Sequence, residues 1–169
     1  MAEEEGQSWD ATVEEWLTAE GKCCAAGMAQ QADGAFYAAA PQADEKGWGY
    51  IWKDPHEETI TADDGVSEEK MTINEAAALL AVATTGQAPK GGLWLGGKKY
   101  TVTQRNMEEE HKECTFKYVF AAASKCGVHI VATTSQITCG FYSEEEGQTS
   151  GNAKAAVFDY AEYLVGINM

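Results

Sequence analysis

The sequence has no long hydrophobic run, and no apolar segment approaches the ~20 residues that a helix needs to cross a lipid bilayer. It contains no Asn-x-Ser/Thr glycosylation sequon, and its first residues, MAEEEG, lack the basic and apolar regions of a secretion signal. The five cysteines are odd in number and irregularly spaced, which does not suit a disulfide framework. We therefore expect a cytoplasmic protein whose thiols are free and buried.

Basic residues are scarce and unevenly distributed. The chain of 169 residues has 12 Lys and Arg against 27 Asp and Glu, for a net charge of -15. Residues 1–75 hold 18 acidic and 4 basic side chains, whereas residues 76–169 hold 9 and 8. An acidic chain repels phosphate backbones and anionic lipids, so we expect no nucleic-acid partner and weak or no phosphoinositide binding. The near-neutral second half is the better surface for an acidic protein partner.

Convincing catalytic and metal motifs are missing. The segment 92–98 matches the G-x-x-x-x-G-K start of a phosphate-binding loop, but its Leu-Trp-Leu-Gly interior favours a strand. Lys99 also stands where such a loop needs a Ser or Thr for magnesium. His111 and Cys114 are three residues apart, but the second ligand pair of a typical zinc site is absent. We expect no enzymatic activity, no cofactor and no metal, with a metal at His111 as the less supported alternative.

Three further polar features have a structural interpretation. His129 lies in an apolar run that is typical of a strand, so we expect a buried, hydrogen-bonded histidine there. The glutamate runs Glu108–Glu110 and Glu144–Glu146 are expected in solvated loops. Catalytic carboxylates need a fixed separation and a perturbed environment, which such runs rarely provide.

Hydrophobic periodicity predicts helices at the two ends of the chain. Trp9, Val13, Trp16 and Leu17 recur at helical spacing within residues 8–20, with Ser8 as N-cap and Gly21 as the end. The last helix is expected to begin within 149–152. Its apolar stripe consists of Ala153, Ala156, Val157, Tyr160, Ala161 and Leu164.

Between these helices the pattern alternates as in strands. Strands are expected at 23–31 and 35–40 around an Asp33-Gly34 turn, at 93–95 and 100–103 around Gly96-Gly97, and at 114–123, 127–134 and 137–142. A short helical segment is expected at 47–53. An acidic hairpin is expected at 56–73, followed by a helix that Asn74 or Thr72 caps and Gly86 ends. This order predicts a single antiparallel α+β domain over residues 1–169.

Four segments, in this order along the chain, resemble profilins. They are Ser8–Val13, Asp33–Ala38, Leu95–Val102 and Tyr160–Leu164. The resemblance covers nearly the whole chain, and the acidic insert at 56–73 is similar to that of the apicomplexan-type branch. It implies a central antiparallel sheet with the N- and C-terminal helices on one face and short helices on the other.

The resemblance implies a monomer of the cytoplasm and cytoskeleton that binds monomeric actin and regulates filament assembly. It places the actin-binding surface on the later strands and the start of the last helix. The residues carried over are Lys99, Thr101, Val102, Gln104, Arg105, Lys125, Asn152, Lys154, Phe158 and Asp159. We expect the acidic hairpin to tune actin affinity without being required for folding.

The resemblance also implies a groove for proline-rich peptides, such as those of formins, between the terminal helices. Its residues are Trp9, Thr12, Tyr37, Tyr163, Leu164 and Met169. Rigid aromatic faces suit polyproline II ligands, and we expect Leu164 to belong to the core instead. Because Thr12 and Met169 stand where many profilins have aromatic residues, we expect weak peptide binding.

Two other classes of function remain as alternatives. A small enzyme on this scaffold would need a cluster of perturbed polar groups, which the sequence does not show. An interaction or lipid-sensing module on a profilin-like fold would not bind actin, since one fold can carry several functions.

Overall fold

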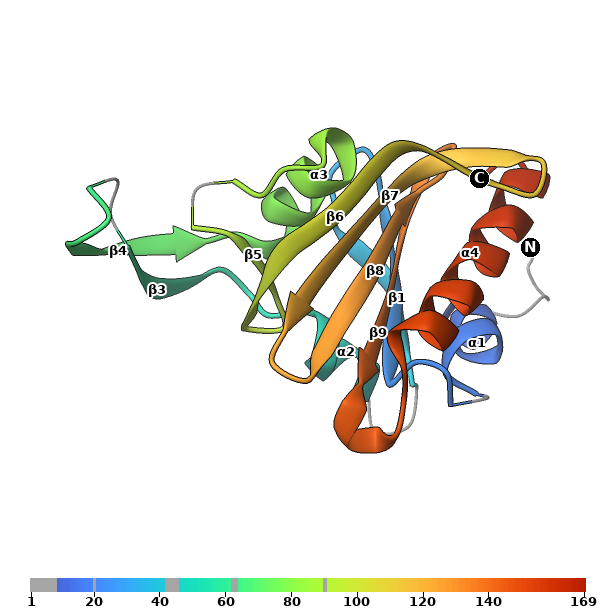
Figure 1. Cartoon of the computed structure of the whole chain (residues 1–169), viewed down its shortest axis with the longest axis horizontal. Helices are drawn as coiled ribbons and strands as arrows, with labels where there is room; N and C mark the ends of the chain where they lie inside the picture. Colours follow the sequence, from blue (N-terminus) through green and yellow to red (C-terminus); the bar gives the residue numbers. More distant parts are fainter. Residues whose placement is uncertain (1–8, 20, 42–45, 62–63, 90) are drawn as a thin grey trace.

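One seven-stranded antiparallel sheet organises the chain, in a computed structural model that describes residues 9–19, 21–41, 46–61, 64–89 and 91–169. The strands are β1 (Ala25–Gln30), β2 (Phe36–Ala40), β5 (Leu93–Leu95), β6 (Lys98–His111), β7 (Cys114–Ala123), β8 (Cys126–Ala132) and β9 (Gln136–Ser143). Their order across the sheet is β2-β1-β9-β8-β7-β6-β5 (Figure 1). Because β1 pairs with β9, the first and last parts of the chain lie next to each other.

Helices cover both faces of this sheet. They are α1 (Trp9–Val13), the π-helical turn η1 (Glu14–Thr18), α2 (Lys46–Ile51), α3 (Glu75–Thr85), the 3-10 turn η3 (Glu144–Glu146) and α4 (Ser150–Gly166). Val13, Leu17 and Leu164 anchor the terminal helices in one core, and Ile51 and Leu79 anchor α2 and α3 in the other. The expected arrangement of helices on the two faces is thus confirmed.

The predicted cap and end of α3 and the predicted start of α4 agree with the structure, whereas the N-terminal helix ends at Thr18, before the expected Gly21. The Asn74 side chain accepts a hydrogen bond from the Ala77 N–H, and Gly86 ends α3 with a left-handed φ of 78°. At α4, the Thr149 side chain accepts a hydrogen bond from the Asn152 N–H. The proposed cap Ser8 lies outside the described residues.

The N-terminal helix differs from the regular helix expected over 8–20. After α1 the backbone continues as the π-helical η1, which Ala19 closes by donating its N–H to the Glu14 carbonyl at 2.7 Å. Such a turn contains more residues than an α-turn and rotates the following side chains around the axis. Leu17 is fully buried as a result, whereas Trp16 at the edge of the apolar stripe is 37% exposed.

The strand β6 is much longer than expected, and the prediction of a loop at Glu108–Glu110 was wrong. Antiparallel pairing with β7 continues from Thr101 to His111, interrupted by two irregularities in register. Since β6 lies near the edge of the sheet, its glutamates can point to solvent while the backbone pairs on one side. The run Glu144–Glu146, also expected in a loop, forms the exposed turn η3.

The acidic hairpin forms a separate two-stranded sheet. Its strands β3 (His56–Thr61) and β4 (Glu68–Ile73) pair from His56 with Ile73 to Thr61 with Glu68, which confirms the predicted hairpin. Figure 1 shows the hairpin projecting from the body of the protein beside β5. All five cysteines are free, as expected, but only Cys23, Cys126 and Cys139 are buried, whereas Cys24 and Cys114 are half-buried. Among the described helices none is long and apolar enough to cross a membrane.

Candidate functional site

A buried carboxylate, Glu75, holds the turn at which β6 begins. The side chain of Glu75 is fully buried at the first position of α3. Its Oε1 accepts hydrogen bonds from the N–H groups of Lys53 (3.0 Å) and Gly96 (2.8 Å), and its Oε2 accepts one from Gly97 (2.8 Å). The His56 Nε2 lies 3.0 Å from the same Oε2. One side chain thus joins the Gly-Gly turn, the end of α2 and the base of the hairpin.

The role of Glu75 could not be recognised in the sequence, since an acidic residue at the start of a helix is common on solvated surfaces. Gly96 and Gly97, which donate to Glu75, indicate a tight turn more clearly in the sequence. Gly96 and Gly97 both have positive φ values, of 63° and 81°. A Cβ at Gly96 would lie 2.0 Å from the Tyr50 carbonyl oxygen, so the turn approaches α2 too closely for a side chain.

The expected actin-binding residues on β6 are divided between the two faces of the sheet. Tyr100 points into the core under α3, so Lys99 and Thr101 leave the strand on the opposite face. The Lys99 side chain then runs beside Gly92 and lines, with Arg105, a hollow at the end of α3. After the irregularity at residue 103, Gln104 pairs with Phe120 and lies on that same face. Val102 instead packs against the core under α3.

Arg105 also lies on the face opposite α4. It pairs with Val119, whose side chain belongs to the core under α3. A Cβ at Gly86 would lie 2.6 Å from the Arg105 Cδ, so this side chain crosses the end of α3. Lys117 donates to the Thr84 carbonyl at 3.2 Å nearby, and both cations therefore lie at the negative end of the α3 dipole.

The first half of α4 contributes an aromatic surface with one cation. The Lys154 Nζ lies 5.1 Å from the Tyr118 ring centroid and 5.3 Å from that of Phe158. Phe158 itself is buried, edge-to-face against Phe116 and Tyr118. Phe158 therefore supports this surface from beneath. Asn152, in the first turn of α4, and Lys125, in the β7–β8 turn, are exposed.

His129 supports α4 from the sheet, as the expected structural histidine. Its Nδ1 accepts a hydrogen bond from the Tyr118 hydroxyl at 2.9 Å, and its Nε2 donates to the Ser150 carbonyl at 3.0 Å. The ring is stacked on Phe120 with centroids 4.7 Å apart. Burial lowers the pKa of His129 to about 4, and Lys154 acts in the same direction.

The terminal helices present a second surface, built on stacked aromatic rings. The Trp16 and Tyr163 rings are stacked with centroids 5.0 Å apart and planes 24° apart, and Tyr160 stacks on Tyr163 at 5.8 Å. Trp16 lines two hollows, of about 470 and 400 Å³. The sequence signal for Trp16 was its position seven residues after Trp9, which places both on one side of a helix.

The residues expected in the peptide groove pack on one apolar cluster. Trp9, Tyr37, Tyr163 and Met169 are half-buried against the core under α4, and Leu164 is fully buried in it, as expected. Burial raises the pKa of Tyr37 to about 12, and its hydroxyl donates to the Gln136 side chain. Thr12 is half-buried on α1.

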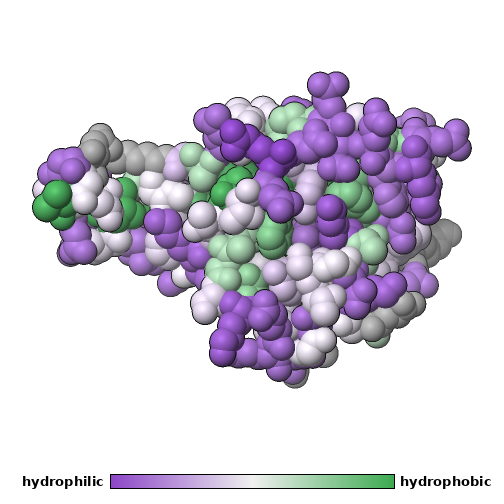
Figure 2. Space-filling model, viewed as in Figure 1, coloured by the Kyte–Doolittle hydropathy of each residue, from purple (hydrophilic) through white to green (hydrophobic). Residues whose placement is uncertain are grey.

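Hydrophilic side chains dominate the view of the molecule in Figure 2, with small hydrophobic patches between them. Such a mixture is typical of interaction surfaces of moderate affinity. Asp159 pairs with His111 at 3.1 Å and with Lys112 at 3.7 Å, and it also lines the hollows beside Trp16.

Comparison with known proteins gives the context for these surfaces. The family model for profilin matches residues 7–169. The chain is 33% identical to a profilin of Plasmodium falciparum over 170 residues, which covers 97% of both chains. It is 30% identical to the profilin of Plasmodium berghei over 167 residues, which covers 95% of both.

Solved structures agree at the level of the fold. Acanthamoeba castellanii profilin II superposes with a TM-score of 0.65 at 20% identity, covering 96% of this chain and 100% of that one. Mouse profilin IIa, in complex with a double repeat from the FH1 domain of mDia1, superposes with a TM-score of 0.61 at 13% identity and the same coverage. The chain therefore belongs to the profilin family, and it is a profilin of the apicomplexan type.

Proposed function

We propose that this protein binds monomeric actin and regulates filament assembly in the cytoplasm, as a binding protein and not an enzyme. The main support is membership of an actin-binding family along residues 7–169, which include both surfaces described above. The proposed actin surface comprises Lys99, Thr101 and Gln104 on β6, with Asn152 and Lys154 on α4. Thr101 and Gln104 leave β6 on the sheet face on which α4 packs, and Lys154 lies over the Tyr118 and Phe158 rings.

The proposed actin surface contains fewer residues than the set expected from the sequence. Val102 and Arg105 point toward α3, and Phe158 is buried, so we propose structural roles for these three. Lys125 is exposed in the turn between β7 and β8, and we place it at the margin of the proposed actin surface. Asp159 is left out because of its ion pairs with His111 and Lys112.

Charge reversal of both lysines on this face is expected to abolish most actin binding. In the variant Lys99→Glu/Lys154→Glu, two attractive charges facing an acidic partner become repulsive, which should weaken binding by about tenfold or more. The readouts are nucleotide exchange on monomeric actin and the rate of actin polymerisation. The control is Lys46→Glu/Lys53→Glu, which makes the same change of charge on exposed lysines of α2 and the loop after it.

Two results would contradict the proposal at different levels. If the Lys99/Lys154 variant matched the wild type while the wild type bound actin, this face would be the wrong one. If the wild type altered neither nucleotide exchange nor polymerisation, the protein would be an interaction or lipid-sensing module that does not bind actin.

We also propose weak binding of proline-rich peptides at the terminal helices. The support is the stack of Trp16 on Tyr163, two rigid faces with an indole N–H and a phenol O–H as hydrogen-bond donors. The mouse relative in complex with an FH1 repeat gives a precedent in the family. The hollows around Trp16 carry charges of both signs, with Glu15 and Lys22 in one and Lys112 and Glu162 in the other.

Replacing Trp16 with alanine is expected to weaken peptide binding measurably. Loss of one stacking face should cost ~1 kcal/mol, or about fivefold in Kd. Titration calorimetry with a polyproline peptide gives the readout, because the variant also changes tryptophan emission. Trp16→Phe should retain part of the affinity, and Trp52→Ala on the opposite side should retain all of it. Equal affinity of Trp16→Ala and the wild type would remove Trp16 from the site.

A further inference from the structure

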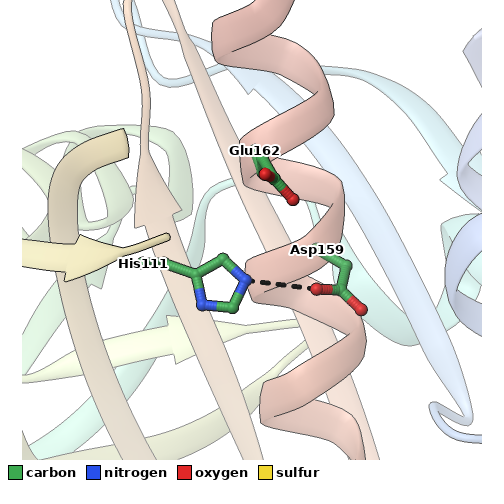
Figure 3. Close-up of side chains that lie close together, drawn as sticks. All are labelled: His111, Asp159 and Glu162. Carbon is green, nitrogen blue, oxygen red and sulfur yellow. Dashed lines mark hydrogen bonds and ion pairs between the residues drawn. The ribbon is translucent and has the colours of Figure 1, made fainter. Parts of the chain in front are cut away.

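A histidine and two carboxylates converge at the tip of the β6–β7 hairpin. His111 is the last residue of β6, and Asp159 and Glu162 lie three residues apart on α4, so both project from one side of the helix. Figure 3 shows the three side chains directed toward one another. The His111 Nε2 lies 3.1 Å from the Asp159 Oδ1, and one ligand atom from each of the three lies within 4.8 Å of the others.

Packing holds the imidazole in this position. The His111 ring lies edge-to-face on Phe158, with centroids 5.4 Å apart, and also contacts Phe116 at 6.5 Å. Its side chain is 22% exposed, so the apolar body of the ring is covered while Nε2 faces α4. The histidine is therefore oriented toward both carboxylates before any ligand arrives, which lowers the entropy cost of binding.

Lys112 supplies the cation between the carboxylates. Its Nζ lies 3.2 Å from the Glu162 Oε1 and 3.7 Å from the Asp159 Oδ1. The residue has a left-handed φ of 56°, and its side chain is 58% exposed. An exposed ion pair contributes little to stability, so the ammonium can be displaced at small cost.

We propose that His111, Asp159 and Glu162 bind a divalent transition-metal ion, best matched by zinc, in the place that the Lys112 ammonium takes here. Zinc accepts histidine nitrogen and carboxylate oxygen at about 2.0–2.2 Å, so two ligands of a tetrahedral ion are roughly 3.4 Å apart. The 3.1 Å between the His111 Nε2 and the Asp159 Oδ1 is close to this separation. The imidazole argues against calcium and magnesium, which prefer all-oxygen sites.

Binding of the ion would have a local consequence. The hollow beside this cluster is lined by Trp16, Lys112, Asp159, Glu162 and Tyr163. Zinc would attach the β6–β7 tip to α4 and release Lys112 from the wall of that hollow. The emission of Trp16 therefore reports on the site, and the inference does not depend on actin or peptide binding.

The test uses the full chain, freed of metal with a chelator, in calorimetric titration with zinc chloride at neutral pH. We expect one zinc ion per chain, with affinity lowered about tenfold or more in His111→Gln. Lys112→Gln should bind zinc more tightly than the wild type, because the competing cation is gone. Cobalt(II) absorption in the visible range should show a tetrahedral site in the wild type and lose it in His111→Gln.

Cysteine ligands are the competing explanation. Cys114 pairs with His111 across the hairpin, so Cys114→Ser is the control and should keep the wild-type affinity. Loss of zinc binding in Cys114→Ser, or equal binding by His111→Gln and the wild type, would overturn the assignment. A Lys112→Gln variant that bound zinc no more tightly would also count against it. Melting curves without metal confirm that each variant is folded.

Discussion

Replacing Glu75 with alanine is expected to lower the free energy of unfolding by about 3–5 kcal/mol. The substitution removes the acceptor for the N–H groups of Lys53, Gly96 and Gly97 and the partner of His56. It also leaves a cavity, because the side chain is fully buried. The loss is large because one buried carboxylate accepts hydrogen bonds from the loop after α2 and from the Gly-Gly turn.

The consequences should extend to the proposed actin surface. Gly96 and Gly97 form the turn from which β6 begins, and Lys99 and Thr101 are among its first residues. Without Glu75 the turn would lose two hydrogen bonds of 2.8 Å. We therefore expect weaker actin binding in Glu75→Ala even at temperatures where the protein stays folded.

Thermal and urea denaturation give the measurement. A fall in Tm of roughly 10 °C is expected for a chain of this size. Glu75→Gln should lie between alanine and wild type, because its one amide oxygen can still accept from two donors. Glu57→Ala, an exposed acidic residue of β3, serves as the control for loss of negative charge. If Glu75→Ala melted with the control, the hydrogen bonds to its carboxylate would not support the fold.

Acidification below pH 6.5 is expected to destabilise the protein through His129. Burial lowers the pKa of this histidine from 6.5 to about 4, so the folded state favours the neutral ring. The unfolded chain binds the proton first as the pH falls. This stability is fully present above pH 6.5 and is lost progressively toward pH 4, in total about 3 kcal/mol.

The measurement compares urea unfolding at several pH values between 6.5 and 5, above the titration of most carboxylates. His129→Gln should be less stable at neutral pH but should show a flatter dependence on pH. Relief of repulsion within the acidic chain acts in the opposite direction in both proteins, so the difference between them isolates His129. Parallel pH profiles for His129→Gln and the wild type would contradict the prediction.

Local sequence signals predicted most elements because their causes are local. The Asn74 cap, the Gly86 end and the Thr149 cap depend on residues within one helical turn. The long β6 could not be recognised in this way, since the pairing of Glu109 and Glu110 with β7 outweighs their low preference for strands.

In the candidate surfaces, too, some features follow from local sequence and others depend on contacts between distant segments. The sequence indicated which residues of β6 could bind a partner, but the irregularity at residue 103 decides which face each one occupies. Trp16 was visible as part of an apolar stripe, and the π-helical η1 leaves it partly exposed beside Tyr163. No spacing rule joins His111 to Asp159 or Glu75 to Gly96, because these partners are distant along the chain.

By itself, the amino-acid sequence determined the family, the order of helices and strands, the acidic hairpin and the concentration of bases in the second half of the chain. Hydrophobic periodicity, turn residues and composition are enough to predict these properties. Only the tertiary structure decided that Glu75 is a buried anchor, that Arg105 crosses the end of α3, and that His111 meets Asp159 and Glu162. Burial and side-chain partners arise from contacts between distant segments, which local patterns do not encode.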